Sequence, residues 1–292
     1  MSTYSIKDLE NLTGIQAHTI RIWEQRYNLL SPERTPTNIR KYSEKDLRKL
    51  LSIALLNNNG LKISKIAKLS DMNIAETVLQ LSEGEDSNIE SQIESLKMIM
   101  VDMNEAKFEK LFSHMVLQMG FEETILKIFV PFFKRLTFLW QTESVTVAQI
   151  NFITSLYKQK VYVAIDGLSP PEKMNSKKFI MFLPKTEQLD NGLLLYNYLA
   201  KKRGFQTLYL GASLPSEGLS DILGKNPDSY LLSVATLAKI DLTAYYTKIL
   251  AACTENQKLL LTGSQINTVK INNSRLILFQ DYIEFKDFLD RL

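Results

Sequence analysis

The sequence has very few of the residues that build disulfides and metal centres. Among its 292 residues there are one cysteine, Cys253, and two histidines, His18 and His114. A single cysteine excludes an intramolecular disulfide framework and a cysteine-rich zinc site, and it fits a reducing compartment. No potential ligand lies three or four residues after His114, so we interpret this residue as an ordinary part of a helix and expect no metal site.

Long apolar runs are also missing. No run without a charged residue reaches the roughly 18 residues that a membrane-spanning helix needs. The first residues, MSTYSIKDLENL, are polar and lack the apolar core of a signal peptide. We therefore expect a cytoplasmic protein that makes no contact with a membrane.

The remaining composition is that of a folded protein with several domains. Hydrophobic residues make up 45% and charged residues 23%, and the length exceeds the roughly 100–150 residues of one domain. The net charge of +3 is unevenly distributed: residues 1–75 hold 12 Lys and Arg against 7 Asp and Glu, and the rest hold 23 against 25. A basic end on a near-neutral body is typical of a chain that contacts nucleic acid with that end.

Residues 5–42 have the pattern of two short helices followed by a hairpin. Apolar residues at a spacing of three over residues 6–12 predict a helix that ends at Gly14, and residues 15–27 predict a second helix with one apolar and one polar face. Residues 30–42 are punctuated by proline and asparagine and predict a β wing, and Ser43 begins a further helix with a capping signature. The apolar face of the second helix consists of Ile20, Trp23 and Tyr27.

The remainder of the chain has two different patterns of apolar residues. Residues 88–166 give long helical patterns almost free of glycine and proline, which predicts a four-helix bundle. Its expected core contains Phe108, Leu111, Phe112, Met115, Phe129, Phe132, Phe133, Leu136 and Leu139. From residue 178 onward, five short apolar runs alternate with helical segments and predict a parallel sheet whose ligands would bind at the carboxyl ends of the strands.

These patterns together predict a multidomain α and α/β protein. We expect a winged helix-turn-helix in residues 1–75, called the head below, and a helical bundle in residues 88–168, called the bundle. Residues 176–292, called the sheet module, are expected to form a Rossmann-like parallel sheet.

The head resembles the DNA-binding domain of the MerR family. The matching motifs are Tyr4-Ser-Ile6, the Thr13-Gly14 turn, the helix Thr19-Ile-Arg-Ile-Trp-Glu-Gln-Arg26, and the wing with Arg34-Thr35 and Arg40-Lys-Tyr-Ser43. The resemblance implies that the second helix enters the major groove, that the wing lies on the backbone, and that two heads bind an inverted repeat in double-stranded DNA. The expected DNA contacts are Gln16, His18, Thr19, Arg21, Arg26, Arg34, Arg40, Lys41 and Tyr42, and the alternative is that these arginines are solvated surface residues.

Residues 90–292 resemble the helical cap and Rossmann-like cobalamin-binding module of light-dependent MerR-type repressors and of methionine synthase. The segments that carry the resemblance include Leu139-Trp140, Glu187 to Gly192, Tyr209-Leu-Gly211 and Thr262-Gly263. The resemblance implies pocket positions at Trp140, Ile150, Asn151, Leu189, Gly192, Gly211 and Gly263.

The chain departs from that family where the family has histidines. The family pattern is Trp-x9-Glu-His in the cap, where this sequence has Ile150-Asn151, and Glu-x-His-Glu-x-Gly in the module, where it has Leu189 in the place of histidine. Neither residue supplies an imidazole to cobalt, so we expect no cofactor and a pocket that is empty or repurposed. The alternative is cobalamin bound with its own nucleotide base on cobalt.

The function predicted from these features is that of a sequence-specific DNA-binding transcriptional regulator, not an enzyme. Its C-terminal part would serve oligomerisation, as a dimer or tetramer, and sensing of an unknown effector. One alternative is a repressor that changes its oligomeric state with cobalamin or another ligand. The least favoured alternative is a corrinoid-dependent methyl carrier or enzyme.

Overall fold

The computed structural model describes residues 3–83, 89–168 and 177–292. Its helices and strands form two compact units, residues 1–156 and residues 157–292. The division falls inside one long helix, α10 (Val147–Asp166). None of the described helices is both long and apolar enough to cross a lipid bilayer.

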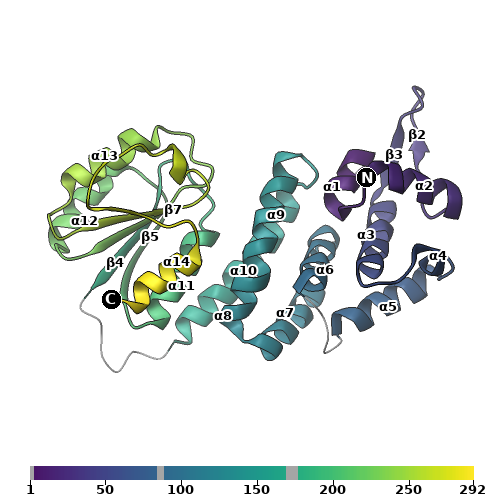
Figure 1. Cartoon of the computed structure of the whole chain (residues 1–292), viewed down its shortest axis with the longest axis horizontal. Helices are drawn as coiled ribbons and strands as arrows, with labels where there is room; N and C mark the ends of the chain where they lie inside the picture. The colour runs from purple at the N-terminus through teal and green to yellow at the C-terminus, as the bar shows by residue number, and fades with distance from the viewer. Residues whose placement is uncertain (1–2, 84–88, 169–176) are drawn as a thin grey trace. The chain divides into compact units, whose positions relative to one another are not determined.

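The head has two helices between the first and second strands of its small sheet (Figure 1). Helix α1 (Ile6–Thr13) begins with Ser5 and Asp8 capping each other's backbone N–H groups and ends at Gly14, whose φ of 72° is the left-handed conformation that favours glycine. Helix α2 (Ala17–Tyr27) follows after this turn. The sheet has the antiparallel order β1-β3-β2, with β1 (Thr3–Tyr4), β2 (Glu33–Arg34) and β3 (Arg40–Ser43).

The second half of the head is a long apolar helix with shorter ones after it. Helix α3 (Glu44–Asn58) begins at the capping box of Ser43 and Asp46. Six residues along it, Leu50, Leu51, Ile53, Ala54, Leu55 and Leu56, are at most 1% exposed. A helix that buries its residues on all sides must be covered from several directions. Helices α4 (Ile63–Ile66) and α5 (Asp71–Glu83) follow, and α3 packs against both of them and against α6 (Ile89–Asp102).

The bundle contains α6, α7 (Glu105–Met119), α8 (Phe121–Thr124), α9 (Val130–Gln141) and α10. A π-helical turn, η1 (Ile125–Phe129), joins α8 to α9. Pro131 has no N–H to donate to the preceding turn, which favours this break in the regular hydrogen-bond ladder. Of the nine predicted core residues, all are buried except Phe133, which is half-buried.

The sheet module has a five-stranded parallel sheet of order β5-β4-β6-β7-β8. The strands are β4 (Lys178–Pro184), β5 (Gln206–Leu214), β6 (Tyr230–Val234), β7 (Lys258–Thr262) and β8 (Leu276–Leu278). One face is covered by α11 (Asn191–Lys202) and α14 (Tyr282–Asp290), the other by α12 (Ser220–Lys225) and α13 (Leu242–Ala252) (Figure 1). Short 3-10 turns lie at Ser216–Leu219 (η2) and Ile266–Thr268 (η3). The predicted fold class, helical parts with a parallel α/β sheet, is confirmed.

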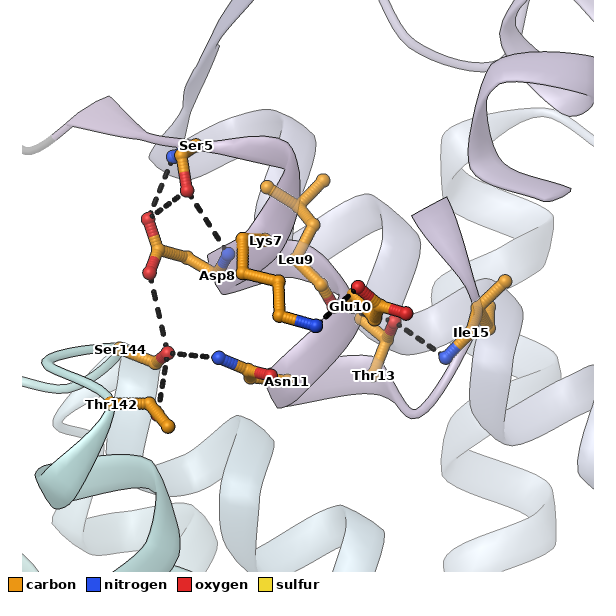
Figure 2. A network of polar contacts seen from close by, with 10 residues as sticks. All are labelled: Ser5, Lys7, Asp8, Leu9, Glu10, Asn11, Thr13, Ile15, Thr142 and Ser144. Carbon is orange, nitrogen blue, oxygen red and sulfur yellow. Dashed lines mark hydrogen bonds and ion pairs between the residues drawn. The ribbon is translucent and has the colours of Figure 1, made fainter. Parts of the chain in front are cut away.

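Within the first unit, polar side chains connect α1 of the head to the loop that precedes α10. Ser144 Oγ donates to Asp8 Oδ1 at 3.3 Å and accepts from Asn11 Nδ2 at 3.1 Å, and it also bonds Thr142 Oγ1 (Figure 2). Asp8 therefore has two roles, because the same carboxylate caps the first turn of α1 through Ser5. The side chain that begins the first helix also holds that helix on the rest of the unit.

Candidate nucleic-acid interface and cobalamin-type module

The second helix of the head presents a polar face to solvent. Ile20 and Trp23 are buried against the rest of the head, whereas the face opposite them is exposed. Of the predicted DNA contacts, Gln16, His18, Arg21 and Arg26 lie on this exposed side, and Thr19 is half-buried. The helix thus offers guanidinium, amide and imidazole groups together, which are the donors and acceptors that read base edges and phosphates.

The wing is the β2–β3 hairpin. Arg34 is exposed, and its Nη1 donates to Asn38 Oδ1 at 2.7 Å, while the left-handed Asn38 (φ 62°) closes the turn. Lys41 is exposed as well. Arg34 and Lys41 therefore place two exposed positive charges on a short hairpin.

Arg40 and Tyr42 lie differently from the expected direct contacts. Glu24 of α2 accepts hydrogen bonds from Arg40 Nε at 3.1 and 3.2 Å and from the Tyr42 hydroxyl at 3.1 Å. Tyr42 has no exposed surface. The expectation that Tyr42 touches DNA is therefore corrected: its ring is core, and its hydroxyl ties the wing strand to α2.

The protonation state of Tyr42 suits this role. Burial, with the neighbouring Glu24 carboxylate adding to it, raises the pKa of Tyr42 to about 12. The hydroxyl therefore keeps its proton at neutral pH and remains a donor to Glu24. Arg40, with a side chain 21% exposed, neutralises the charge of the same carboxylate. The three groups form one polar cluster that fixes the wing against the helix.

Two exposed apolar residues were missed by sequence reasoning. Ile22 of α2 is 50% exposed and Ile39 of the wing is 62% exposed. The available signal was that Ile22 falls outside the spacing of Ile20, Trp23 and Tyr27. An apolar side chain that is not on the buried face needs another explanation when its neighbours, such as Arg21, are polar.

In the bundle, the three predicted pocket positions lie near the end of α9 and the start of α10. Trp140 is 42% exposed, Asn151 is exposed and Ile150 is half-buried. The backbone oxygens of Ile150 and Asn151 both accept from Thr154 Oγ1, at 2.7 and 3.2 Å. On these two residues the bonds use backbone atoms only. The side chains offer an amide at Asn151 and only hydrocarbon at Ile150, where the family pattern has Glu-His.

In the sheet module, the loop after β4 is organised by a buried carboxylate. Glu187 is 1% exposed, and its Oε2 accepts from the backbone N–H groups of Thr236 and Leu237 at 2.8 and 2.6 Å. Its Oε1 accepts from the N–H of Leu189 at 3.3 Å. The loop after β4 and the loop after β6 are thus joined at the carboxyl end of the sheet, which is where open α/β sheets bind ligands. Leu189 itself is 37% exposed and has no atom able to coordinate a metal.

Asp190, the next residue, is held by a second polar cluster within the same unit. It forms an ion pair with Lys158 of α10, and it accepts from the Tyr209 hydroxyl of β5 at 3.3 Å. Burial and the adjacent Asp190 charge raise the pKa of Tyr209 far above its usual range, so it is a permanent donor. The segment around Leu189 is therefore anchored by this chain's own side chains on both sides.

The glycines at the predicted pocket positions have different local reasons. Gly263 has a φ of 109°, and a Cβ there would lie 2.3 Å from the backbone oxygen of Ala235. Gly211 also has a positive φ, of 77°, whereas a Cβ on Gly192 would make an ordinary 3.7 Å contact with Val234. Gly263 is thus required by the close approach of two loops of the protein itself. Among the described residues, no group of three or more His, Cys, Asp or Glu side chains could hold a metal ion.

A winged helix-turn-helix followed by a helical bundle and a Rossmann-like sheet defines a DNA-binding regulator with a B12-binding type of domain. Residues 4–73 match the family model of MerR HTH family regulatory proteins, and residues 92–165 match that of the B12 binding domain. The chain is that of a DNA-binding transcriptional regulator whose head is similar to MerR proteins, and both resemblances predicted from the sequence are confirmed.

Individual relatives agree with this assignment. The chain is 24% identical over 241 residues to the HTH-type transcriptional repressor CarH of Myxococcus xanthus, covering 79% of this chain and 78% of the relative. It is 23% identical over 255 residues to the HTH-type transcriptional repressor CarA of the same organism, covering 86% and 83%. The head alone is similar to the regulator TnrA of Bacillus subtilis, with 36% identity over 76 residues, 26% of this chain and 66% of TnrA.

A solved structure supports the fold of the C-terminal part. The monomethylamine corrinoid protein of Methanosarcina barkeri superimposes with a TM-score of 0.51 at 12% identity, covering 70% of this chain and all of that one. At this identity the likeness shows the fold alone.

Proposed function

We propose that two heads bind an inverted-repeat operator, each with the exposed face of α2 in the major groove. The observation that carries this proposal is that Gln16, which caps α2, and His18, Arg21 and Arg26 on α2 are all exposed, while the other side of the helix is anchored in the core. Arg21 can donate two parallel hydrogen bonds to a guanine edge, and Arg26 can reach a phosphate. Thr19, half-buried at the edge of this face, completes the set.

Ile22 adds a specificity element to this face. An apolar side chain beside polar ones, on the helix proposed to enter the groove, suits contact with the C5-methyl group of thymine. The proposal therefore expects a thymine opposite Ile22 in each half-site.

The wing contributes affinity more than sequence selection. Arg34 and Lys41 are exposed and suit phosphate oxygens, which fix register without reading bases. Arg40 and Tyr42 act indirectly through Glu24, which sets the angle between wing and α2. Arg40 retains a partly exposed guanidinium that can share a phosphate with the wing.

We assign no catalysis to the C-terminal part, and we place the protein in the cytoplasm as an oligomer with an effector still to be identified. The domain limits proposed are residues 1–75, 88–168 and 176–292. Histidine-ligated cobalamin does not fit the donor set: Leu189 and Asn151 stand where the family pattern has histidine, and Glu187 and Asp190 are occupied by bonds within the protein. These contacts support a repurposed module without cofactor.

One alternative has a specific observation in its favour. Residues 92–165 match the B12 binding domain, so cobalamin that keeps its own nucleotide base on cobalt remains a candidate effector that changes the oligomeric state. The likeness to a corrinoid protein shows fold alone, so no methyl transfer is proposed.

The test is a titration of the full-length protein against DNA from upstream of its own gene, followed by fluorescence anisotropy, with and without adenosylcobalamin, in the dark and after illumination. We expect specific binding that is the same in all four conditions. Equal affinity for an unrelated duplex would overturn the operator proposal. A change with adenosylcobalamin or light, together with visible colour retained by the purified protein, would replace the cofactor-free proposal with the cobalamin-responsive one.

A further inference from the structure

A cavity of about 500 Å³ lies within the first unit, between the head and the bundle. The head contributes the turn between α1 and α2, including Gly14 and Ile15, and the bundle contributes one side of α6 and one side of α9. The cavity therefore touches the turn that positions the proposed recognition helix. None of the functions assigned above uses it.

The polar part of the cavity is a carboxylate with one free oxygen. Glu94 of α6 is 4% exposed; its Oε1 is 2.7 Å from Lys97 Nζ and 3.6 Å from Arg135 Nη1, and its Oε2 has no hydrogen-bond partner among the described residues. Lys97 is 5% exposed and donates to the backbone oxygen of Leu12 in α1 at 2.8 Å. A buried carboxylate oxygen without a donor is unfavourable, so a ligand that supplies a donor gains affinity here.

The solvent side of the cavity has a free positive charge. Arg135 is bound by both oxygens of Glu90 at 2.6 Å, but Lys134 is exposed and has no ion-pair partner in the described parts of the chain. The five charged groups that line the cavity are Glu90, Glu94, Lys97, Lys134 and Arg135, two negative and three positive. This balance disfavours a simple cation as the ligand.

The remaining wall is apolar. Phe138 of α9 is 53% exposed, which is high for a phenylalanine, and Leu139 lies beside it. An aromatic ring left in solvent at the edge of a cavity is a contact surface for the hydrocarbon part of a ligand.

From these three features we infer that the cavity is an effector site for a small α-amino acid with an apolar side chain. Its ammonium group donates to Glu94 Oε2, its carboxylate pairs with Lys134, and its side chain lies against Phe138. A simple amine would be repelled by the net positive charge, and a simple acid would leave the Glu94 oxygen without a donor.

Binding there would act on the head through Lys97. An ammonium group at Glu94 shares the charge that now holds Lys97, and Lys97 is the residue that bonds the end of α1. Occupancy therefore changes how firmly the α1–α2 turn is held, which couples the ligand to DNA affinity. The effector role rests on the proposed DNA-binding function, but the site itself does not.

The site is tested by isothermal titration calorimetry of the full-length protein with L-phenylalanine, L-leucine and L-methionine. We expect one saturable site for at least one of them. For L-phenylalanine, 3-phenylpropionate lacks the ammonium group and phenethylamine lacks the carboxylate, and both should bind at least about tenfold more weakly. Absence of saturable heat with all three amino acids at millimolar concentration would overturn the inference.

Two exposed variants locate the ligand without risk to the fold. Lys134→Gln and Phe138→Ser should each reduce amino-acid affinity by about tenfold, whereas Lys127→Gln, an equal loss of charge on η1 outside the cavity, should leave it unchanged. Wild-type affinity in both cavity variants would place the binding elsewhere and overturn the site.

The effector role is tested by repeating the operator titration with saturating amino acid. A change of about fivefold or more in operator affinity is expected, and no change would overturn the coupling through Lys97. A protein that binds the amino acid but no DNA at all would contradict the proposed function while supporting the site, so the two failures are distinguishable.

Discussion

At the scale of single residues, the head separates side chains that face solvent from side chains that hold the exposed ones in place. Arg21 and Arg26 are of the first kind, and Tyr42 and Glu24 are of the second. Mutations of the two kinds should have different effects, because the second kind contributes more to the free energy of unfolding.

Arg21→Ala should weaken operator binding by at least about tenfold, since a bidentate contact with a base is worth about 1–3 kcal/mol. If Arg21 instead contacts a phosphate, the salt dependence of binding should also fall by about one unit of slope. Anisotropy titrations at several salt concentrations distinguish the two cases. Arg291→Ala removes the same charge from an exposed position in the sheet module and is the matched control. Unchanged affinity in the Arg21 variant would show that this arginine is only a solvated surface residue.

Tyr42→Phe removes one hydroxyl from a buried ring. The bond to Glu24 is lost, so the free energy of unfolding should fall by about 1.5–3 kcal/mol, because this bond is made to a charged group. Both tryptophans of the chain, Trp23 and Trp140, lie in the first unit, so urea unfolding followed by their fluorescence reports on the correct part of the protein. A variant as stable as the wild type that also loses operator affinity would return Tyr42 to the set of direct DNA contacts.

At the scale of elements, the features that could be predicted well from the sequence are those that depend on residues close together in the chain. The Gly14 turn, the Ser43 cap and the burial of Ile20 and Trp23 depend on residues only a few positions apart. The Glu24 cluster could not be seen in the same way, since its members are 16 and 18 residues apart and meet only when the wing folds back on α2.

Helix α6 is a second element whose environment could not be predicted from the sequence. Every residue from Ser91 to Lys97 is buried, although five of these seven are polar or charged. Sequence reasoning assigns such residues to a solvated face, because it cannot know that the head covers one side of the helix. The cavity beside Glu94 was therefore outside the reach of any pattern in the sequence.

Gly263→Ala tests the loop architecture of the sheet module. A Cβ would enter the space of the Ala235 backbone, and alanine also disfavours a φ of 109°, so the module should lose about 3 kcal/mol of stability. Gly224→Ala is the control, since nothing lies within 4 Å of a Cβ there and Gly224 is inside α12; it should be neutral or slightly stabilising. Differential scanning calorimetry resolves the transition of the module. Equal transition temperatures for both variants would show that the Ala235 loop can move away.

At the scale of the whole molecule, the described structure consists of two units, and the head is part of the first one together with most of the bundle. Buried charge lies at the place where head and bundle meet. Lys97 and Glu94 are buried with each other, and Lys97 also bonds the end of α1.

Lys97→Met should destabilise the first unit by about 3 kcal/mol at neutral pH, because it leaves the buried Glu94 carboxylate with only the more distant Arg135, 3.6 Å from its Oε1, as a cation. Burial already raises the pKa of Glu94, so the stability linked to this group is present at acid pH and is lost as pH rises through its folded-state pKa. The cost of the variant should therefore shrink at acid pH, where Glu94 is protonated. Urea unfolding of the variant and the wild type, followed by tryptophan fluorescence at neutral and at acid pH, measures this difference in stability. Lys127→Met, at an exposed ion pair, is the control and should lower the free energy of unfolding only slightly at either pH. An equal loss of stability for Lys97→Met at the two pH values would refute the buried-charge explanation.

The apolar helix α3 has a consequence for how this protein can evolve. Its residues Ile53, Leu55 and Leu56 have no exposed surface, and α3 packs directly against α6 of the bundle. A recombination event that moved the head alone into another gene would expose the apolar side of α3 that packs against α6. The product would aggregate unless the new neighbour supplied a matching helix. A head that is found without α6 in another protein must therefore have a different element over this surface of α3.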